Sequence, residues 1–182
     1  EAKKNDIKIK INVVAIKNFN EKELHSIIEW ANQMEIDLTF IEIMPMNETD
    51  SERYLQFLPL NKVFEKLNSN YNFFKINKNT GGPAVYYKSN NLKINVGFIT
   101  PLTDNFCSSC NRVRITCTGK LFMCLGQNNY VDLKEILRSD CSDDYIKDRI
   151  KFALKIKPEK HDFLIEKNTK PYLKRYMNVT GG

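Results

Sequence analysis

The sequence predicts an α/β fold, and two strand patterns with a helix between them are the basis of that prediction. Residues 7–16 alternate apolar and polar side chains, whereas residues 38–44 form the nearly continuous apolar run of a strand buried on both faces. Between them, residues 20–34 carry apolar side chains at helical spacing. Strand, helix and strand in this order predict a parallel βαβ unit with a right-handed crossover.

The predicted helix begins at a candidate capping box. Asn20 is followed three residues later by Glu23, and such a pair satisfies free N–H groups at a helix start. Apolar side chains then recur on one face, at Leu24, Ile27, Ile28 and Ala31. The helix is predicted to end near Met34. Because a lone βαβ unit offers too little sheet to be stable, we expect the remaining strands to lie upstream of this chain.

Shorter and more polar elements follow Pro45, and their order is typical of an α+β part with antiparallel strands. Beyond a polar loop at 47–56, the predicted elements are a helix at 60–67, strands at 84–87 and 92–99, a hairpin of 112–117 and 121–124 that turns at Thr118-Gly119, and helices at 133–138 and 142–154. Ser142 is the expected N-cap of the last helix. We therefore divide the chain into domains 1–46 and 47–182.

Composition and charge limit the class of protein. Of the 182 residues, 42% are hydrophobic and 27% are charged, as in ordinary soluble globular proteins. No apolar stretch approaches the ~20 residues that a membrane span needs, and the start does not resemble a signal peptide. Since the first residue is not Met, we expect a piece of a longer chain. The net charge of +6 suits an anionic partner but does not choose between a nucleotide, a nucleic acid and none.

The cysteines are concentrated in one stretch, at Cys107, Cys110, Cys117, Cys124 and Cys141. Their odd number and the lack of an export signal argue against a disulfide framework and favour a metal site. Cys107 and Cys110 can reach one metal centre from a single turn, and Cys124 returns on the neighbouring hairpin strand. Three thiolates suit either a zinc ion with a fourth ligand or a cubane cluster with one open iron, and the spacing does not distinguish the two.

Two arginines follow the cysteine pair. If residues 111–114 form a strand, Arg112 and Arg114 point to the same face, next to the metal. Two fixed guanidinium groups there would bind phosphate oxygens. The alternative is a pair of solvated arginines on a sheet surface, but the neighbouring metal site favours the functional interpretation.

Three segments resemble one enzyme family. The central one, GFITPLTDNFCSSCNRVRITCTGKLFMCL at residues 97–125, closely resembles the second-cluster region of MoaA-type GTP 3',8-cyclases. The segment FIEIMPM at residues 40–46 and the terminal Gly181-Gly182 match the same family. The resemblance extends from about residue 7 to residue 182, and its central motif is specific because cysteine spacing, paired arginines and flanking apolar residues agree.

The resemblance implies a radical S-adenosylmethionine (SAM) enzyme of molybdenum cofactor biosynthesis, a lyase that converts GTP to 3',8-cyclo-7,8-dihydro-GTP. Its fold would be the last βαβ part of an incomplete β/α (partial TIM) barrel, followed by an α+β C-terminal domain with antiparallel strands and an iron–sulfur site. Residues 1–46 would belong to the barrel, and residues 47–182 would hold the second 4Fe-4S cluster and the GTP site. In this family a first cluster splits SAM, and the second cluster binds the guanine through its open iron.

The family pattern assigns roles to individual residues. The second cluster would be ligated by Cys107, Cys110 and Cys124. GTP would be bound by Lys10, Arg112, Val113 and Arg114. Met44 would contact SAM. The catalytic residues would be Gly181 and Gly182, because only residues without side chains can approach the substrate closely.

Two departures from the family pattern affect the expected activity. No CxxxCxxC motif is present for the first cluster, so the chain alone is expected to be inactive without the missing N-terminal half, which carries SAM and that cluster. Thr39 stands where the family usually has an Arg, and this change would remove a contact to the triphosphate worth about 1–3 kcal/mol. Outside the motif, we expect Cys117 and Cys141 to be small buried side chains. His25 is expected to be solvated and His161 structural.

Two other functions fit part of the pattern. An auxiliary-cluster domain of another radical SAM enzyme would share the cysteine spacing, although the paired arginines favour a phosphorylated substrate. A zinc-stabilised binding module would fit the cysteines but would explain neither FIEIMPM nor the terminal glycines. We expect GTP and the missing half of the barrel as partners, no nucleic acid and no membrane, with a homodimer left open. The expected location is cytoplasmic, or the mitochondrial matrix in a eukaryote.

Overall fold

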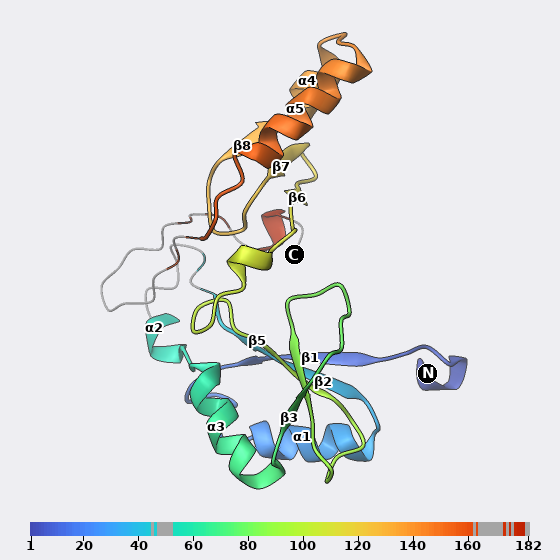
Figure 1. Ribbon diagram of the computed structural model, residues 1–182, viewed down its shortest axis with the longest axis vertical. Helices are drawn as coiled ribbons and strands as arrows, with labels where there is room; N and C mark the ends of the chain where they lie inside the picture. Colours follow the sequence, from blue (N-terminus) through green and yellow to red (C-terminus); the bar gives the residue numbers. More distant parts are fainter. Residues whose placement is uncertain are drawn as a thin grey trace. The chain divides into compact units, whose positions relative to one another are not determined.

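The computed structural model divides the chain into two compact units, which are drawn in Figure 1. The residues that it describes are 1–44, 46, 53–161, 163, 173, 175 and 177–180. Unit 1 comprises Glu1–Met44 and Glu52–Phe106, and unit 2 comprises Pro45–Ser51 and Cys107–Gly182. These units differ from the domains predicted from the sequence, because residues 52–106 pack with residues 1–44. The assignment of barrel and C-terminal domains stays a prediction.

Unit 1 is built on a five-stranded sheet in the order β1-β2-β5-β4-β3. Its strands are β1 (Lys10–Ala15), β2 (Asp37–Glu42), β3 (Phe74–Ile76), β4 (Val85–Lys88) and β5 (Val96–Ile99). β1, β2 and β5 are parallel, whereas β4 and β3 run antiparallel to their neighbours. The predicted parallel βαβ unit is therefore confirmed. β5, β4 and β3 extend the sheet from downstream of β2, so a larger part of the sheet than expected lies within this chain. That further strands lie upstream stays a prediction.

The first two strands and the helix between them lie close to their predicted positions. β1 begins at Lys10 rather than at Ile7, and exposure alternates along most of it. β2 buries Leu38 and Phe40 completely, as its apolar run predicts. Helix α1 spans Leu24–Gln33, and its buried residues share the predicted apolar face.

Asn20 does not cap α1, contrary to the predicted capping box. The N-cap is Glu23, which makes no side-chain cap hydrogen bond. The Asn20 amide instead donates to the Val14 carbonyl at 2.9 Å and accepts from the Ile16 N–H at 2.8 Å. Asn20 thus fixes the turn after β1, because backbone groups at a strand end need partners and a short amide side chain can reach them.

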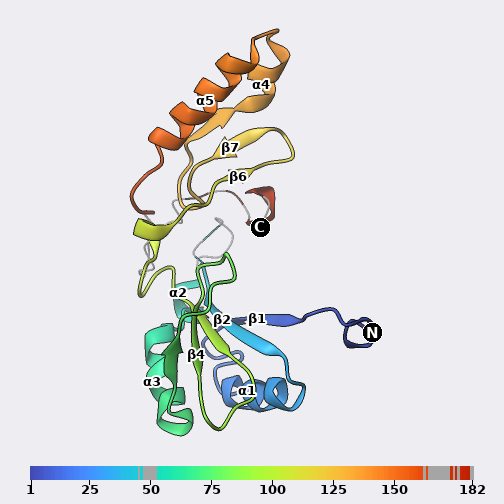
Figure 2. The same ribbon diagram turned by 45° about the vertical axis from the view of Figure 1, so that its right-hand side comes forward.

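Helices α1 and α3 cover one face of this sheet, as Figures 1 and 2 show. α3 spans Leu60–Tyr71 and is preceded by a short helix, α2 (Arg53–Gln56), within the segment predicted to be a loop. Helices and sheet share one hydrophobic core. Its fully buried members are Ala15, Ile28, Ala31, Leu38, Phe40, Leu60 and Val96. Burial of this apolar surface is the main stabilising contribution to unit 1.

Among the described residues of unit 1, one charged side chain is buried. Glu42, the last residue of β2, is 1% exposed. It accepts hydrogen bonds from the N–H groups of Leu60, Leu102 and Thr103 at 3.1, 2.9 and 3.2 Å, and from the Thr103 hydroxyl. Because Leu60 is the first residue of α3, the carboxylate also meets the positive end of that helix. Glu42 therefore joins β2, α3 and the segment that leads toward Cys107.

Unit 2 contains a three-stranded antiparallel sheet in the order β6-β7-β8. Its elements are the 3-10 helix η2 (Cys107–Ser109), β6 (Arg114–Ile115), β7 (Lys120–Phe122), β8 (Tyr130–Asp132), α4 (Leu133–Arg138), α5 (Asp143–Lys155) and the 3-10 helix η3 (Met177–Thr180). The predicted hairpin is confirmed, with Gly119 in the left-handed region (φ 83°) at its turn. α4 has its predicted bounds, and Ser142 caps α5 by accepting from the Tyr145 N–H.

The two sheets confirm a mixed α/β chain with one sheet that contains parallel strands and a separate antiparallel sheet. The barrel and the iron–sulfur site remain predictions. Within the part of the chain that the structure describes, no helix is both long and apolar enough to cross a membrane.

Replacing Glu42 should destabilise unit 1. Glu42→Ala leaves several buried N–H donors without an acceptor, and we expect the free energy of unfolding to fall by roughly 2–4 kcal/mol. Urea denaturation followed by circular dichroism measures this loss. Glu65→Gln, at an exposed position of α3, is the matched control and should change stability little. Equal stability of Glu42→Ala and the control would contradict the role given to Glu42.

Asp37 should make stability depend on pH. Burial raises the pKa of this carboxyl, but hydrogen bonds from Lys78 and Asn95 outweigh burial and leave the pKa lowered. A lowered pKa stabilises the fold above the unfolded value of about 3.9, and this contribution is lost as the pH falls through the folded value. We expect Asp37→Asn to cost about 1–2 kcal/mol at pH 7 and less at pH 3.

Urea midpoints measured at both pH values test the Asp37 prediction. Asp148→Asn removes an exposed pair with Lys151 and should have little effect at either pH. A cost of Asp37→Asn that does not shrink toward pH 3 would contradict the prediction.

Candidate functional site

The three cysteines predicted to bind metal lie together in unit 2. Cys107 opens η2, and the Cys110 N–H donates to the Cys107 carbonyl at 3.1 Å, so both lie on a single 3-10 turn. Cys124 follows β7. Both Cys107 and Cys110 interact electrostatically with the Cys124 thiol. The three thiols come from two separate segments of unit 2, and the charges of the first two act on the third.

Cys124 is half-buried beside a tightly packed glycine. Burial raises the pKa of its thiol, whereas the Gly126 N–H, which donates to Sγ at 3.4 Å, and the nearby Lys157 ammonium act in the opposite direction. Gly126 has no room for a side chain, because a Cβ there would lie 2.6 Å from Cβ of His161 and 2.9 Å from the Phe163 ring. His161 therefore packs beside the cysteine segment, as a structural residue would.

Lys157 is a site residue that sequence reasoning missed. It follows the end of α5, and its ammonium donates to the carbonyls of Arg112 and Met123 at 3.0 and 2.7 Å. The same Nζ lies 3.9 Å from Cys110 Sγ. A single lysine after a helix carries no recognisable pattern, so only its position beside a resembling segment could have drawn attention to it.

Arg175 is a second cation that the sequence did not identify. Its guanidinium donates to the carbonyls of Leu125 and Gln127 at 2.7 and 2.5 Å and to Asn128 Oδ1 at 2.7 Å. Its centre lies 4.5 Å from the middle of the Phe122 ring, at cation–π distance. Burial lowers the pKa of Arg175, and the Cys124 charge acts in the opposite direction. Arg175 Nε is buried and has no hydrogen-bond partner among the described residues.

This donor set fits an anionic group held by sulfur. No three His, Cys, Asp or Glu side chains in the described part of the chain are placed to hold a metal ion as they stand. The chemistry, however, is consistent: three thiols, a backbone N–H directed at one of them, and two cations beside them. Soft thiolates select iron–sulfur clusters and zinc over hard cations, and N–H donors to sulfur are typical of cluster sites. The orphaned Arg175 Nε is a further donor available to such a group.

Three of the predicted GTP-binding residues, Arg112, Val113 and Arg114, follow Cys110 closely in the sequence. Arg114 begins β6, whereas Arg112 and Val113 precede that strand. Both arginines are half-buried and Val113 between them is 39% exposed, which is the alternation expected if the arginines share a face. Cys110 and Arg112 are joined through Lys157, which contacts both.

Lys10 and Met44 belong to unit 1. Lys10 donates to the Tyr86 hydroxyl at 3.2 Å, and Thr80 Oγ1 lies at the same distance from it. Burial raises the pKa of Tyr86, but the hydrogen bonds from Thr80 and Lys10 outweigh it and leave the pKa lowered. Met44 is half-buried, two residues after β2 ends.

Five other predicted residues have different outcomes. Gly181 and Gly182 lie outside the described residues. Cys117 is exposed rather than buried, because it sits at the open turn of the hairpin. Cys141 is half-buried and donates to the Ile136 carbonyl at 3.0 Å, so it is bound to its own helix end rather than enclosed in a core. His25 is exposed, as expected for a solvated residue, but its Nδ1 lies 2.7 Å from the Tyr71 hydroxyl.

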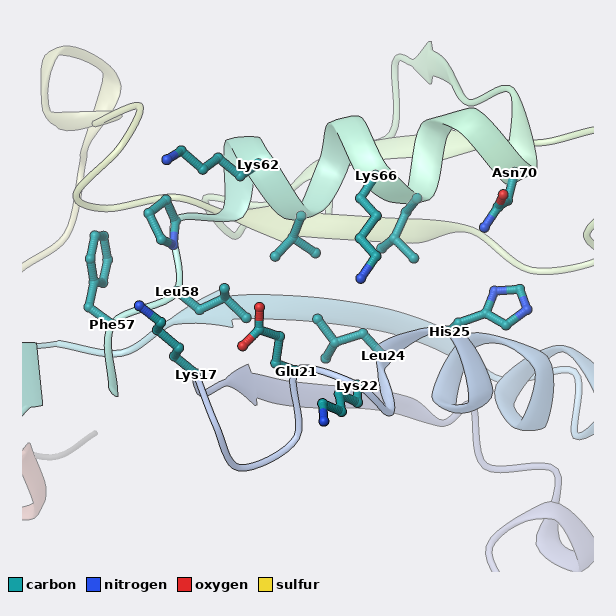
Figure 3. Close-up of a pocket in the computed structure, with 13 residues that line it drawn as sticks. Lys17, Glu21, Lys22, Leu24, His25, Phe57, Leu58, Lys62, Lys66 and Asn70 are labelled. Atoms are coloured by element: carbon teal, nitrogen blue, oxygen red, sulfur yellow. The ribbon is translucent and has the colours of Figure 1, made fainter. Parts of the chain in front are cut away.

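A pocket of about 350 Å³ lies in unit 1 between α1 and α3, and Figure 3 shows its lining. Its apolar floor includes Leu24, Leu58, Val63 and Leu67. Its charged rim is formed by Lys17, Lys22, Lys62, Lys66 and Glu21. All four lysines are exposed to solvent, and none of the predicted site residues lines this pocket.

Known proteins resemble the chain over its whole length. A GTP 3',8-cyclase of Brucella ovis is 46% identical over 182 residues, which is all of this chain and 53% of that protein. A GTP 3',8-cyclase of Nitrobacter hamburgensis is 45% identical over 174 residues, which is 96% of this chain and 51% of that protein. The chain therefore spans about half the length of these relatives.

The family comparison covers most of the residues described above. Residues 36–163 match the family Molybdenum Cofactor Synthesis C, and that range includes all the predicted cysteine ligands and both predicted phosphate-binding arginines. The match extends over both compact units. It begins just before β2 and ends in the segment that follows α5. On this evidence the chain belongs to the Molybdenum Cofactor Synthesis C family.

Proposed function

We propose that this chain supplies the second iron–sulfur cluster and part of the GTP site of a GTP 3',8-cyclase in molybdenum cofactor biosynthesis. The observation that carries the proposal is that unit 2 holds three electrostatically coupled thiols and that Arg112 and Arg114 closely follow Cys110 in sequence. The family membership and the named activity of the relatives support it. The proposed location is the cytoplasm, where thiolates stay reduced.

The proposed cluster is held by Cys107, Cys110 and Cys124. Three protein ligands leave one iron open, and when bound the cluster would supply this iron as a site for the guanine of GTP. The chain's own residues hold the thiols in place: the η2 turn positions the first two, and the Gly126 N–H and Lys157 orient the third. The protein thus contributes orientation and charge, while the cofactor carries the chemistry.

The proposed phosphate contacts come from Arg112, Arg114 and Lys10. A guanidinium group can donate two parallel hydrogen bonds to phosphate oxygens, and it stays charged at all physiological pH values. Thr39 is fully buried and cannot replace the missing arginine at its own position. SAM, the first 4Fe-4S cluster and the contact from Met44 would complete the site in the intact protein, together with a partner half that this chain does not contain.

Iron analysis tests the proposed cluster. We expect about four irons and four sulfides per second-cluster site after anaerobic reconstitution of the intact protein, and we expect Cys124→Ala to lose them. Cys141→Ala removes a cysteine outside the predicted ligand set and should keep the full content. Stoichiometric zinc, with no iron taken up on reconstitution, would overturn the proposal and favour a zinc-stabilised binding module.

GTP binding tests the arginines separately. Arg114→Gln should weaken GTP binding to the reconstituted protein about 10- to 100-fold, because each charge-assisted contact contributes about 1.5–3 kcal/mol. Isothermal titration calorimetry measures the affinity. Arg138→Gln, in the last turn of α4, removes the same charge away from the cysteines and serves as the control. Equal affinity of Arg114→Gln and this control would remove Arg114 from the phosphate site.

A further inference from the structure

The residues before and after Cys124 each have their carbonyl bound by a cation. The Met123 carbonyl, on one side, accepts from Lys157 at 2.7 Å. The Leu125 carbonyl, on the other side, accepts from Arg175 at 2.7 Å. The two cations come from segments far along the chain, 34 and 50 residues from the carbonyls they bind. The backbone on both sides of Cys124 in the sequence is therefore held by side chains outside its own hairpin, those of Lys157 and Arg175.

Lys157 also joins Cys124 to the other cysteine segment. An ammonium has three N–H donors and no acceptor. Among the described residues, Lys157 Nζ meets the carbonyls of Met123 and Arg112 and, at 3.9 Å, Cys110 Sγ. The Lys157 side chain thus contacts Cys110, Arg112 and Met123, the residue that precedes Cys124.

Arg175 binds the carbonyl that follows Cys124 in the sequence. Its two terminal nitrogens donate to Leu125, Gln127 and Asn128, and its Cζ lies 4.5 Å from the centre of the Phe122 ring. Its Nε remains buried without a partner among the described residues, although a buried unsatisfied N–H is costly. A group bound at the cysteines would be a natural acceptor for such a donor.

Neither cation has a carboxylate partner in the part of the chain that the structure describes. Half-buried cations are normally paired with an opposite charge, because removing a charge from water is costly. Here the negative charge available to Lys157 and Arg175 is that of the cysteine thiolates and of the group that these thiolates would bind. Two cations of this kind therefore indicate a bound group with net negative charge.

We propose that Lys157 and Arg175 form a cationic clamp on Cys124, which fixes this ligand and makes the cluster held by the three cysteines easier to reduce. This inference rests on the proposed function. A cluster ligated by three thiolates is anionic, and reduction adds one more negative charge. Nearby cations and N–H donors stabilise the more negative state, so the clamp raises the reduction potential. Both residues act through Cys124 and are positioning residues.

The test is an anaerobic redox titration followed by electron paramagnetic resonance, with iron content measured on the same samples. Spectra of the intact protein are taken as differences from Cys124→Ala, so that signals of any other cluster cancel. Lys157→Met and Arg175→Gln should each lower the midpoint potential and speed the loss of iron to a chelator at least twofold. Lys157→Arg, which keeps the charge, should restore most of the potential.

Lys155→Met is the matched control, because it removes an exposed lysine two residues away. It should leave both the potential and the iron loss unchanged. Unchanged potentials in Lys157→Met and Arg175→Gln would overturn the clamp. If Lys157→Met does not fold, Arg175→Gln decides the question alone, since Arg175 binds a different carbonyl, that of Leu125.

The outcomes separate this inference from the proposed function. Full iron content in Cys124→Ala would refute the cluster itself and, with it, the clamp. Loss of iron in Cys124→Ala together with wild-type potentials in both clamp variants would retain the cluster and refute only the clamp.

Discussion

Unit 1 depends on a buried carboxylate that needs hydrogen-bond donors from several segments of the chain. Glu42 ends β2 inside the protein, where an ionised group without hydrogen bonds would be too costly to bury. Its donors come from the first turn of α3 and from residues 102–103, so the chain has to bring both to the end of β2. The start of α3 and the exit from the sheet are thus fixed by one side chain. The exit matters because η2 and its cysteine begin at residue 107.

Among the described residues, the cluster of buried apolar side chains in unit 2 is smaller than the one in unit 1. The unit 2 cluster consists of Leu121, Met123, Val131 and Ala153. A core of this size contributes limited hydrophobic stabilisation and leaves little packing to orient nearby side chains. The cysteine segments are instead held by polar contacts, from Lys157, Arg175 and the Gly126 N–H. A bound cluster would add further cross-links between the same segments, so metal binding and folding are expected to support each other.

Local sequence signals predicted most elements but few of the contacts between them. The bounds of α4 and the Ser142 cap followed from residue type alone, and so did the hairpin turn at Gly119. The pairing of β2 with β5 did not, because it joins residues far apart in sequence and β5 is only four residues long. The roles of Lys157 and Arg175 were missed for the same reason: a lysine or an arginine gains meaning only from the carbonyls near it. Family resemblance identified the cysteines, whereas the residues around them required the fold.

The position of Thr39 illustrates how a departure from a family pattern can involve neighbours. Thr39 is fully buried, and a Cβ on Gly97 would come within 2.9 Å of both its Oγ1 and the Tyr86 ring. Residues 39, 86 and 97 therefore share one tightly packed space on the sheet, and a longer side chain at residue 39 would have to displace Tyr86. Positive charge nonetheless remains beside Tyr86, because Lys10 and Lys78 lie 6.0 and 5.3 Å from the centre of its ring. With Thr39 in place of the family's usual arginine, the sheet lacks one cation at this position. Lys10 and Lys78 nevertheless keep the region around Tyr86 positive.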